Sequence, residues 1–500
     1  MSTAKYDLVI QNGHIVDPES GWDGPGNIGV ADGKITAISK ELLQGNKVID
    51  ASGQYVSPGF IDLHSHTVIQ KSGCWLQAFD GVTTALETEV GMLPINQSYE
   101  MYAKQGGRPI NYGFTSSSIF ARIAALENED PNPDVNWYLG SFAKPEWQQQ
   151  LATEEQLERI LALVEQGLKE GAIGIGCNYG FAPALGRKEY YKIAELAKKY
   201  DVPTFTHVRY MSTLEPQSSF EAIEELIGLS FNPGAHMHIC HLNSSSLRDI
   251  DDICELITSS LKNGANISVE SYPYGSLSAP IASAYLLGDQ WSERMGNIQT
   301  SDIEFLGKPL NDDSVAQMRK DSPGNLIICH FLRPENSQAD AEALAKSNLY
   351  PNSSVGSDAM PWQMIGNDQL IEDGVWPFPE GAYAHPRSSG TFTRFIKMYV
   401  REQKKISLIE AIRKMTLIPA QILEKSTPQM ALKGRLKVGA DADIIVFDLD
   451  QVEDRGNFVQ PYLTSAGMSH VIVNGTQIIE NGKLDTSLFP GKPIRRSVTA

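Results

Sequence analysis

The segment Ser57-Pro-Gly-Phe-Ile-Asp-Leu-His-Ser-His ends an apolar run with two histidines, His64 and His66. Alternate residues of a β-strand point to the same side, so we expect both imidazoles to face one spot. Two neutral imidazoles that converge make half of a zinc site. For an isolated His-x-His, a hydrogen-bonded pair on the surface is the alternative interpretation.

Two further histidines end strand-like runs, His207 after Val202-Pro-Thr-Phe-Thr and His241 after His236-Met-His-Ile-Cys. Six of the ten histidines therefore lie at three strand ends, which favours a metal centre over unrelated surface histidines. His236 and His238 share a parity that His241 lacks, so we expect these two to be structural.

Three acidic residues complete the candidate chemistry. Glu87 and Glu89 alternate in the apolar run Gly81-Val-Thr-Thr-Ala-Leu-Glu-Thr-Glu-Val-Gly, so both are expected to face one way. A buried carboxylate needs a compensating charge, and a metal ion supplies it. Alternatively, one or both glutamates could form hydrogen bonds to the rim of the barrel. Asp358, in Val355-Gly-Ser-Asp-Ala, ends a later run and is the best candidate for a general base and acid.

Missing motifs and the composition exclude several other classes. The sequence has no Gly-x-Ser-x-Gly elbow, no Gly-x4-Gly-Lys-Ser/Thr phosphate loop and no His-Glu-x-x-His. A net charge of −18 without a basic block argues against nucleic acid. No run reaches the ~20 apolar residues of a membrane span, and the N-terminus lacks a signal-peptide core. We expect a cytoplasmic enzyme with a small-molecule substrate; the sequence does not define its oligomeric state.

These residues require elements that bring strand ends together. Over residues 58–425, short apolar strands alternate with helical segments, which predicts an α/β fold with a (β/α)8 TIM-like barrel. Periodicity alone does not distinguish this barrel from an open parallel sheet. Residues 284–325 break the alternation and are expected to be an insertion over the barrel mouth. Both chain ends, residues 1–57 and 426–500, carry β-branched runs with Asn-Gly or Asp-Gly turns and are expected to form one small β domain.

The chain resembles the amidohydrolase superfamily, and within it the D-aminoacylase (N-acyl-D-amino-acid deacylase) family. The superfamily resemblance rests on Tyr6-Asp-Leu-Val-Ile-Gln-Asn-Gly, Pro58-Gly-Phe-Ile-Asp-Leu-His-Ser-His, Gly81-Val-Thr-Thr and Gly434-Arg-Leu-Lys-Val-Gly-Ala-Asp-Ala-Asp. The narrower resemblance rests on Gly171-Ala-Ile-Gly-Ile, His207-Val-Arg, Ser271-Tyr-Pro-Tyr, His385-Pro-Arg-Ser-Ser-Gly-Thr-Phe and Arg413-Lys-Met-Thr-Leu-Ile-Pro-Ala.

The resemblance implies that the end domain is a β-sandwich and that the barrel holds one or two divalent ions, with Zn²⁺ the first candidate. It implies that His207 and His241 hold the tighter ion, that His64 and His66 hold the second, and that Asp358 carries the proton.

The resemblance also names substrate-binding candidates. Arg387 and Tyr272 match family positions that hold the carboxylate of the amino-acid substrate, and a guanidinium fork suits a carboxylate. Arg209 and Asn243 are further candidates. Asn243 stands where the family has a lysine, and Met211 stands where it has an acid.

The carboxylate ligand is a departure from the family. Where D-aminoacylases place a metal-binding cysteine, this chain has Val90, so we infer that Glu89 replaces the thiolate, with Glu87 as the fallback. Dihydroorotase-like relatives use a carboxylated lysine at the place that corresponds to Gly176, so a bridging lysine is not expected.

The resulting hypothesis is metal-dependent hydrolysis of a linear amide bond, with an N-acyl-D-amino acid as the leading substrate. Metal-activated water would lose its proton to Asp358, which would then protonate the leaving amine. One alternative is a cyclic-amide hydrolase of the hydantoinase or dihydroorotase kind. A non-catalytic scaffold is the other, and the retained histidines and Asp358 argue against it.

Overall fold

The computed structural model describes residues 5–365 and 370–498 of the chain. Its contacts divide the chain into two compact units. Unit 1 comprises Met1–Leu86, Tyr102–Gly113 and Ser354–Ile494, and unit 2 comprises Glu87–Met101, Phe114–Ser353 and Arg495–Ala500.

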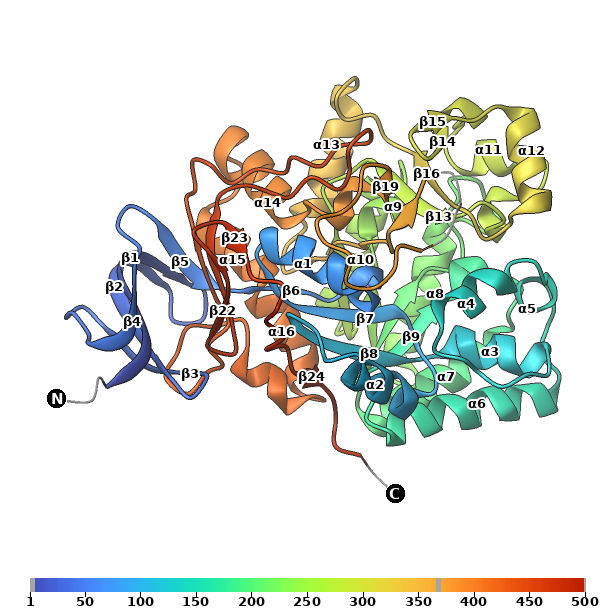
Figure 1. Cartoon of the computed structure of the whole chain (residues 1–500). Coiled ribbons are helices and arrows are strands. Elements are labelled where there is room, and N and C mark those ends of the chain that lie inside the picture. The colour runs from blue at the N-terminus through green and yellow to red at the C-terminus, as the bar shows by residue number, and fades with distance from the viewer. Residues whose placement is uncertain (1–4, 366–369, 499–500) are drawn as a thin grey trace. The chain divides into compact units, whose positions relative to one another are not determined.

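Strands from both chain ends form one sheet within unit 1, in the order β23-β22-β21-β20-β5-β1-β2-β3, and β4 pairs with β1 (Figure 1). These strands are β1 Tyr6–Asp17, β2 Trp22–Ala31, β3 Lys34–Ser39, β4 Gly45–Asp50, β5 Tyr55–Pro58, β20 Ile444–Phe447, β21 Met468–Val473, β22 Thr476–Glu480 and β23 Lys483–Leu484. Buried branched side chains such as Ile10, Ile28 and Val446 form its core. The domain boundaries at residues 57 and 426 stay a prediction.

Three tight turns in this sheet have the geometry that their sequences predict. Both residues have positive φ in Asp32-Gly33, Asn474-Gly475 and Asn481-Gly482. These pairs connect the antiparallel neighbours β2–β3, β21–β22 and β22–β23, respectively. Type I′ turns require this backbone, and Asx-Gly pairs tolerate it best.

The second large sheet contains the predicted parallel strands, in the order β17-β12-β11-β10-β9-β8-β7-β6. These strands are β6 Phe60–Asp62, β7 Val82–Met92, β8 Asn111–Ser117, β9 Ile175–Asn178, β10 Pro203–His207, β11 His236–Ile239, β12 Ile267–Ser271 and β17 Ser354–Val355. A parallel bridge within unit 1 pairs Ser65, after β6, with Ala359, after β17, so the first and last strands meet. The sheet is a (β/α)8 barrel, as the alternation predicted.

Helices follow most barrel strands: α1 Lys71–Phe79, α2 Ile95–Lys104, α3 Ser118–Leu126, α6 Glu154–Lys169, α7 Arg187–Tyr200, α8 Ser219–Phe231, α10 Ile250–Lys262, α13 Gln338–Asn348, α15 Leu408–Met415 and α16 Leu417–Glu424. Helix α6 illustrates why they form. Thr153 and Gln156 make a reciprocal capping box at its start, and Ile160, Val164 and Leu168 recur every four residues as one buried face.

Two excursions in unit 2 add structure beyond the barrel. Short helices α4 Val135–Ser141 and α5 Glu146–Gln149 lie between β8 and β9 in the chain. Residues 284–325, the predicted insertion, contain β14 Ile303–Phe305, β15 Lys308–Pro309 and α12 Asp312–Asp321. With β13 Ser276–Pro280 and β16 Leu326–His330 these strands form a sheet in the order β13-β16-β14-β15. Among the described residues, we find no helix that is both long and apolar enough to cross a membrane.

Candidate metal centre

The two histidines of the His-x-His segment meet within unit 1. Strand β6 ends at Asp62, Leu63 forms a bend, His64 and Ser65 form isolated bridges, and a 3-10 helix begins at His66. Both imidazoles are buried, and their Nε2 atoms lie 3.1 Å apart. The two rings thus lie together as predicted, although His66 stands in the 3-10 helix and not in the strand.

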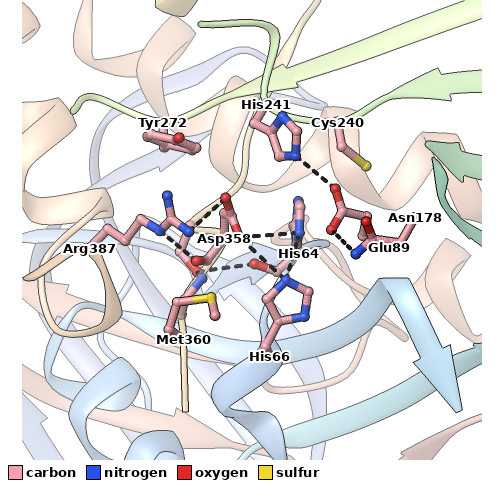
Figure 2. A network of polar contacts seen from close by, with 12 residues as sticks. His64, His66, Glu89, Asn178, Cys240, His241, Tyr272, Asp358, Met360 and Arg387 are labelled. Atoms are coloured by element: carbon pink, nitrogen blue, oxygen red, sulfur yellow. Dashed lines mark hydrogen bonds and ion pairs between the residues drawn. The ribbon is translucent and has the colours of Figure 1, made fainter. Parts of the chain in front are cut away.

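Asp358 joins this pair within unit 1 (Figure 2). Its Oδ1 atom lies 3.3 Å from Nε2 of His66 and 3.5 Å from Nε2 of His64. Its backbone has a φ of 51°, a left-handed conformation that is strained for a residue with a side chain. Arg387 lies next to it, with Nη2 2.8 Å from Oδ2 and Nε donating to the Asp358 carbonyl oxygen.

Asp62 is a residue of this cluster that sequence reasoning missed. Its Oδ1 accepts hydrogen bonds from the backbone N–H groups of His64 and Ser357, at 3.1 and 2.9 Å, and its Oδ2 accepts from Gln77. The carboxylate thus ties the histidine segment to the residue before Asp358. Its signal was available, since residue 62 has the same strand parity as residues 64 and 66.

Glu89 and His241 form the corresponding pair within unit 2 (Figure 2). Oε1 of Glu89 lies 2.7 Å from Nε2 of His241, and Oε2 accepts from the Asn178 amide at 3.0 Å. His241 has a φ of 36°, so it too occupies the left-handed region. Asn178, at the end of β9, was not predicted from the sequence.

The hydrogen bonds around His241 fit a cation. The Ser245 hydroxyl donates its one proton to the Cys240 carbonyl, so its oxygen accepts from Nδ1 of His241, 3.1 Å away. The neutral ring then directs the Nε2 lone pair at the Glu89 carboxylate. That contact is attractive only with a proton on Nε2 or with a cation shared by both groups, which is the arrangement of a metal ligand pair.

His207, at the end of β10, has the same tautomer preference. Its Nδ1 lies 3.0 Å from the Val208 carbonyl oxygen, which can only accept, so Nε2 carries the lone pair. The His207 and His241 ring centroids are 4.8 Å apart. Gly180 packs against this ring so closely that a Cβ there would lie 2.1 Å from Cε1 of His207.

The remaining ligand candidates are Glu87 and position 176. Glu87 is buried on β7, and its Oε1 accepts from the backbone N–H of Gly91 at 3.3 Å. A Cβ at Gly176 would lie 2.6 Å from the Glu89 carbonyl oxygen, so this packing has no room for a lysine at that place. Unit 2 therefore offers a glutamate, rather than a carboxylated lysine, to accompany the histidines.

Tyr272 and Asn243 are predicted substrate-binding residues, and both lie in unit 2. The ring of Tyr272 lies edge-on to His241, with centroids 6.4 Å apart. Asn243 donates to the Tyr274 carbonyl and accepts from the Ser271 hydroxyl, so its amide fixes the segment that carries Tyr272.

Arg209, another predicted substrate-binding residue, is held by protein groups. Its Nε and Nη2 bind the Glu225 carboxylate at 2.9 and 2.8 Å, and Nη1 donates to two backbone carbonyls. One side of this guanidinium is thus occupied by a protein carboxylate. Arg209 also lines a pocket, and its role in substrate binding stays a prediction.

This pocket lies within unit 2 and has a volume of about 290 Å³. It is lined by Gly180, Pro183, Ala184, Arg209, Tyr210, Met211, Ser212, Gln217, Ala284, Tyr285, Leu287 and Arg294. Tyr285 also stacks on His207, with centroids 5.7 Å apart and planes 25° apart. The pocket and the candidate ligand His207 therefore share the walls Tyr285 and Gly180.

Comparison with known proteins shows which proteins this chain is similar to. The chain is 27% identical to an N-acyl-D-glutamate deacylase of Alcaligenes xylosoxydans xylosoxydans, over 99% of this chain and 98% of that protein. It is 26% identical to an N-acyl-D-aspartate deacylase of the same organism, over 95% and 92%. The fold matches the crystal structure of an N-acyl-D-glutamate deacylase from Bordetella bronchiseptica, solved with zinc and a phosphonate inhibitor, with a TM-score of 0.75, 23% identity and coverage of 98% and 100%.

The sequence profile of the amidohydrolase family matches residues 55–478. This match spans the barrel strands and, of the sheet built from the two chain ends, β5, β20, β21 and part of β22. It confirms the resemblance read from the histidine and glycine motifs. The chain belongs to the amidohydrolase family.

Proposed function

We propose that this protein hydrolyses the amide bond of N-acyl-D-amino acids with the help of one or two divalent ions, Zn²⁺ first among them. The observation that carries this proposal is the contact between Glu89 and His241, in which a lone pair faces a carboxylate. The activities of the two deacylase relatives support the substrate class. We propose a cytoplasmic enzyme that acts on small molecules.

The proposed ligands are nitrogen and oxygen donors, which suit zinc. His207, His241 and Glu89 are assigned to the tighter ion, and His64 and His66 to the second. A bound ion supplies a polarised carbonyl and a water molecule of lowered pKa. Barrel topology supports this grouping, because side chains from the carboxyl ends of several strands build the active site of such folds.

We assign the transfer of the proton from water to the leaving amine to Asp358. Its Oδ2 is held by Arg387, whereas Oδ1 faces the two imidazoles of unit 1. Oδ1 is therefore the oxygen that accepts a proton from water and later gives it to the leaving amine.

The substrate side chain is assigned to the pocket beside His207. Its walls include Met211 and Tyr285, and Arg294 contributes a positive charge. Nη1 of Arg294 makes two long contacts, 3.4 Å to the Ser212 hydroxyl and 3.2 Å to the Pro216 carbonyl, and no described acid pairs with it. An acidic side chain, as in the two relatives' substrates, suits this guanidinium.

The test is metal content per chain together with amine release from a panel of N-acyl D- and L-amino acids. One or two zinc equivalents with release from D-substrates alone is the expected result. Metal without release from any N-acyl amino acid, but with opening of a hydantoin or dihydroorotate ring, would support the cyclic-amide alternative. A chain without metal would support the scaffold alternative.

A further inference from the structure

The amide of Asn178 holds one oxygen of Glu89 within unit 2. Asn178 ends strand β9 and is 2% exposed, and its Nδ2 donates to Oε2 of Glu89 at 3.0 Å. The other oxygen, Oε1, lies 2.7 Å from Nε2 of His241. Figure 2 shows Glu89 between these two side chains, with one carboxylate oxygen directed at each. The two oxygens of Glu89 therefore have different partners.

The backbone of β9 explains how Asn178 reaches this carboxylate. A Cβ at Gly176 would lie 2.6 Å from the Glu89 carbonyl oxygen, so this side of β9 faces strand β7. Asn178, two residues later, points the same way, because alternate residues of a strand share a side. The strand register also pairs Asn178 with His207 of β10, so its amide stands at the level of a candidate ligand. Gly176 therefore leaves room for the Glu89 backbone, and Asn178 meets the Glu89 side chain.

The charge of Glu89 decides which end of the Asn178 amide faces it. Among the described residues, Oδ1 of Asn178 is buried and has no hydrogen-bond partner. Turning the amide over would place this oxygen against the carboxylate, and both groups only accept hydrogen bonds. A buried oxygen without a partner destabilises the folded chain, whereas a hydrogen bond to a charged group is about twice as strong as a neutral one. The bond to Glu89 is thus the favourable contact of this amide.

Asn348, in helix α13, shows a similar amide with a different acceptor. It is 1% exposed, and its Oδ1 likewise has no partner within the part of the chain that the structure describes. Its Nδ2 donates to two neutral carbonyl oxygens, those of Tyr272 and Leu344, at 3.1 and 2.9 Å. An unpartnered amide oxygen alone is therefore no sign of a role at the site. Asn178 differs because its acceptor is a carboxylate that also faces His241.

We propose that Asn178 is a positioning residue, which holds Oε2 of Glu89 and so makes Oε1 the oxygen that binds the tighter ion. The inference rests on the proposed function, in which Glu89 and His241 are ligands of that ion. The amide engages Oε2, so the oxygen left to face a cation shared with Nε2 of His241 is Oε1. Hydrogen bonds to metal ligands orient them, and their loss commonly lowers metal affinity by about 10- to 100-fold. Asn178 acts only through Glu89.

The test is the dissociation constant of the tighter zinc ion, measured by competition with a chromogenic chelator. Asn178→Leu keeps the approximate size of the side chain but removes the donor, so we expect the constant to rise by about 10- to 100-fold. Asn348→Leu is the matched control, because it removes a buried amide that donates only to carbonyl oxygens. Its zinc constant should stay within about threefold of the wild type. Asn178→Ala, which needs less space, replaces the leucine variant if that chain does not fold.

A double-mutant cycle separates positioning of Glu89 from a general structural effect. In the Glu89→Ala background the amide has no carboxylate to hold, so adding Asn178→Leu should change the zinc constant by less than about threefold. Losses that multiply in the double variant, or a wild-type constant in Asn178→Leu or Asn178→Ala, would overturn this inference alone. A wild-type constant in Glu89→Ala would instead overturn the ligand set of the proposed function, and the inference with it.

Discussion

Nη2 of Arg387 lies 2.8 Å from Oδ2 of Asp358, and Nε of the same guanidinium donates to the Asp358 carbonyl oxygen at 2.6 Å. The two contacts fix both the side chain and the backbone of Asp358, which has a φ of 51°. The Nε contact is a hydrogen bond and the Nη2 contact is an ion pair. Arg387 is therefore a positioning residue for Asp358 as well as a candidate for binding the substrate carboxylate.

These two roles can be separated with Arg387→Met. If positioning of Asp358 dominates, kcat falls by about 10²–10³ on an N-acyl amino acid, and by a similar factor on an N-acyl amine that has no carboxylate. If carboxylate binding dominates, KM rises on the amino acid, and the variant equals the wild type on the amine. We expect the first pattern, and steady-state kinetics on both substrates decide between them.

A second prediction concerns Glu89 as a metal ligand. Glu89→Gln keeps the shape but loses the charge, so we expect zinc affinity to fall by at least about tenfold, measured by metal content after dialysis against a chelator. Glu87→Gln is the matched control on the same face of β7, and it should retain its zinc. Equal zinc in both variants would remove Glu89 from the ligand set, and a larger loss in Glu87→Gln would assign the ligand to that residue.

The histidine clusters could be predicted because their signals are local. The His-x-His spacing marks His64 and His66, and the end of an apolar run marks His207 and His241. The barrel followed from the alternation of strands and helices over residues 58–425. The histidine signals depend on spacing within a few residues and the barrel on a repeated alternation, and a single sequence displays both.

The contacts that were missed depend on distant partners. Asn178 reaches Glu89 across 89 residues, and a lone asparagine at a strand end carries no signal of that contact. The pairing of Arg209 with Glu225, from helix α8, likewise had no local signal.

A third prediction tests the pocket beside His207. Arg294→Gln removes the charge that is proposed to hold an acidic side chain. We expect kcat/KM for N-acetyl-D-glutamate to fall by about 10- to 100-fold, because a hydrogen bond to a charged group is worth about 1.5–3 kcal/mol. N-acetyl-D-leucine, which has no charge there, is the matched substrate and should change less than about threefold. An equal loss on both substrates would place Arg294 outside side-chain recognition.

A fourth prediction uses the close approach of Gly180 to His207. In Gly180→Ala the new Cβ would lie 2.1 Å from Cε1 of His207, so the imidazole must move. We expect lower zinc affinity and a loss of activity of at least about tenfold, since ligand orientation controls binding. Gly186→Ala is the matched control, because its Cβ would meet only ordinary contacts of 3.6 Å or more. Full zinc binding by Gly180→Ala would contradict the assignment of His207 as a ligand.

A fifth prediction concerns the stability of unit 1 rather than its chemistry. Lys414, at the end of helix α15, is buried, and burial lowers the pKa of its amine to about 7, although Glu410 partly opposes this. An unfolded lysine titrates near 10.5, so between pH 7 and 10.5 the unfolded chain binds more protons at this residue than the folded chain. The free energy of unfolding therefore rises with pH across this window, and below pH 7 the folded state bears the full cost of the buried charge.

Lys414→Met removes the titrating group but keeps an unbranched apolar side chain. We expect the variant to be more stable than the wild type at pH 6.5, on the order of 1–4 kcal/mol, with the advantage shrinking towards pH 9.5. The measurement is the difference in urea midpoint between variant and wild type at the two pH values. Lys188→Met, at an exposed lysine, is the control and should show no such trend. A Lys414→Met effect that is the same at both pH values would mean that the buried amine does not titrate in this window.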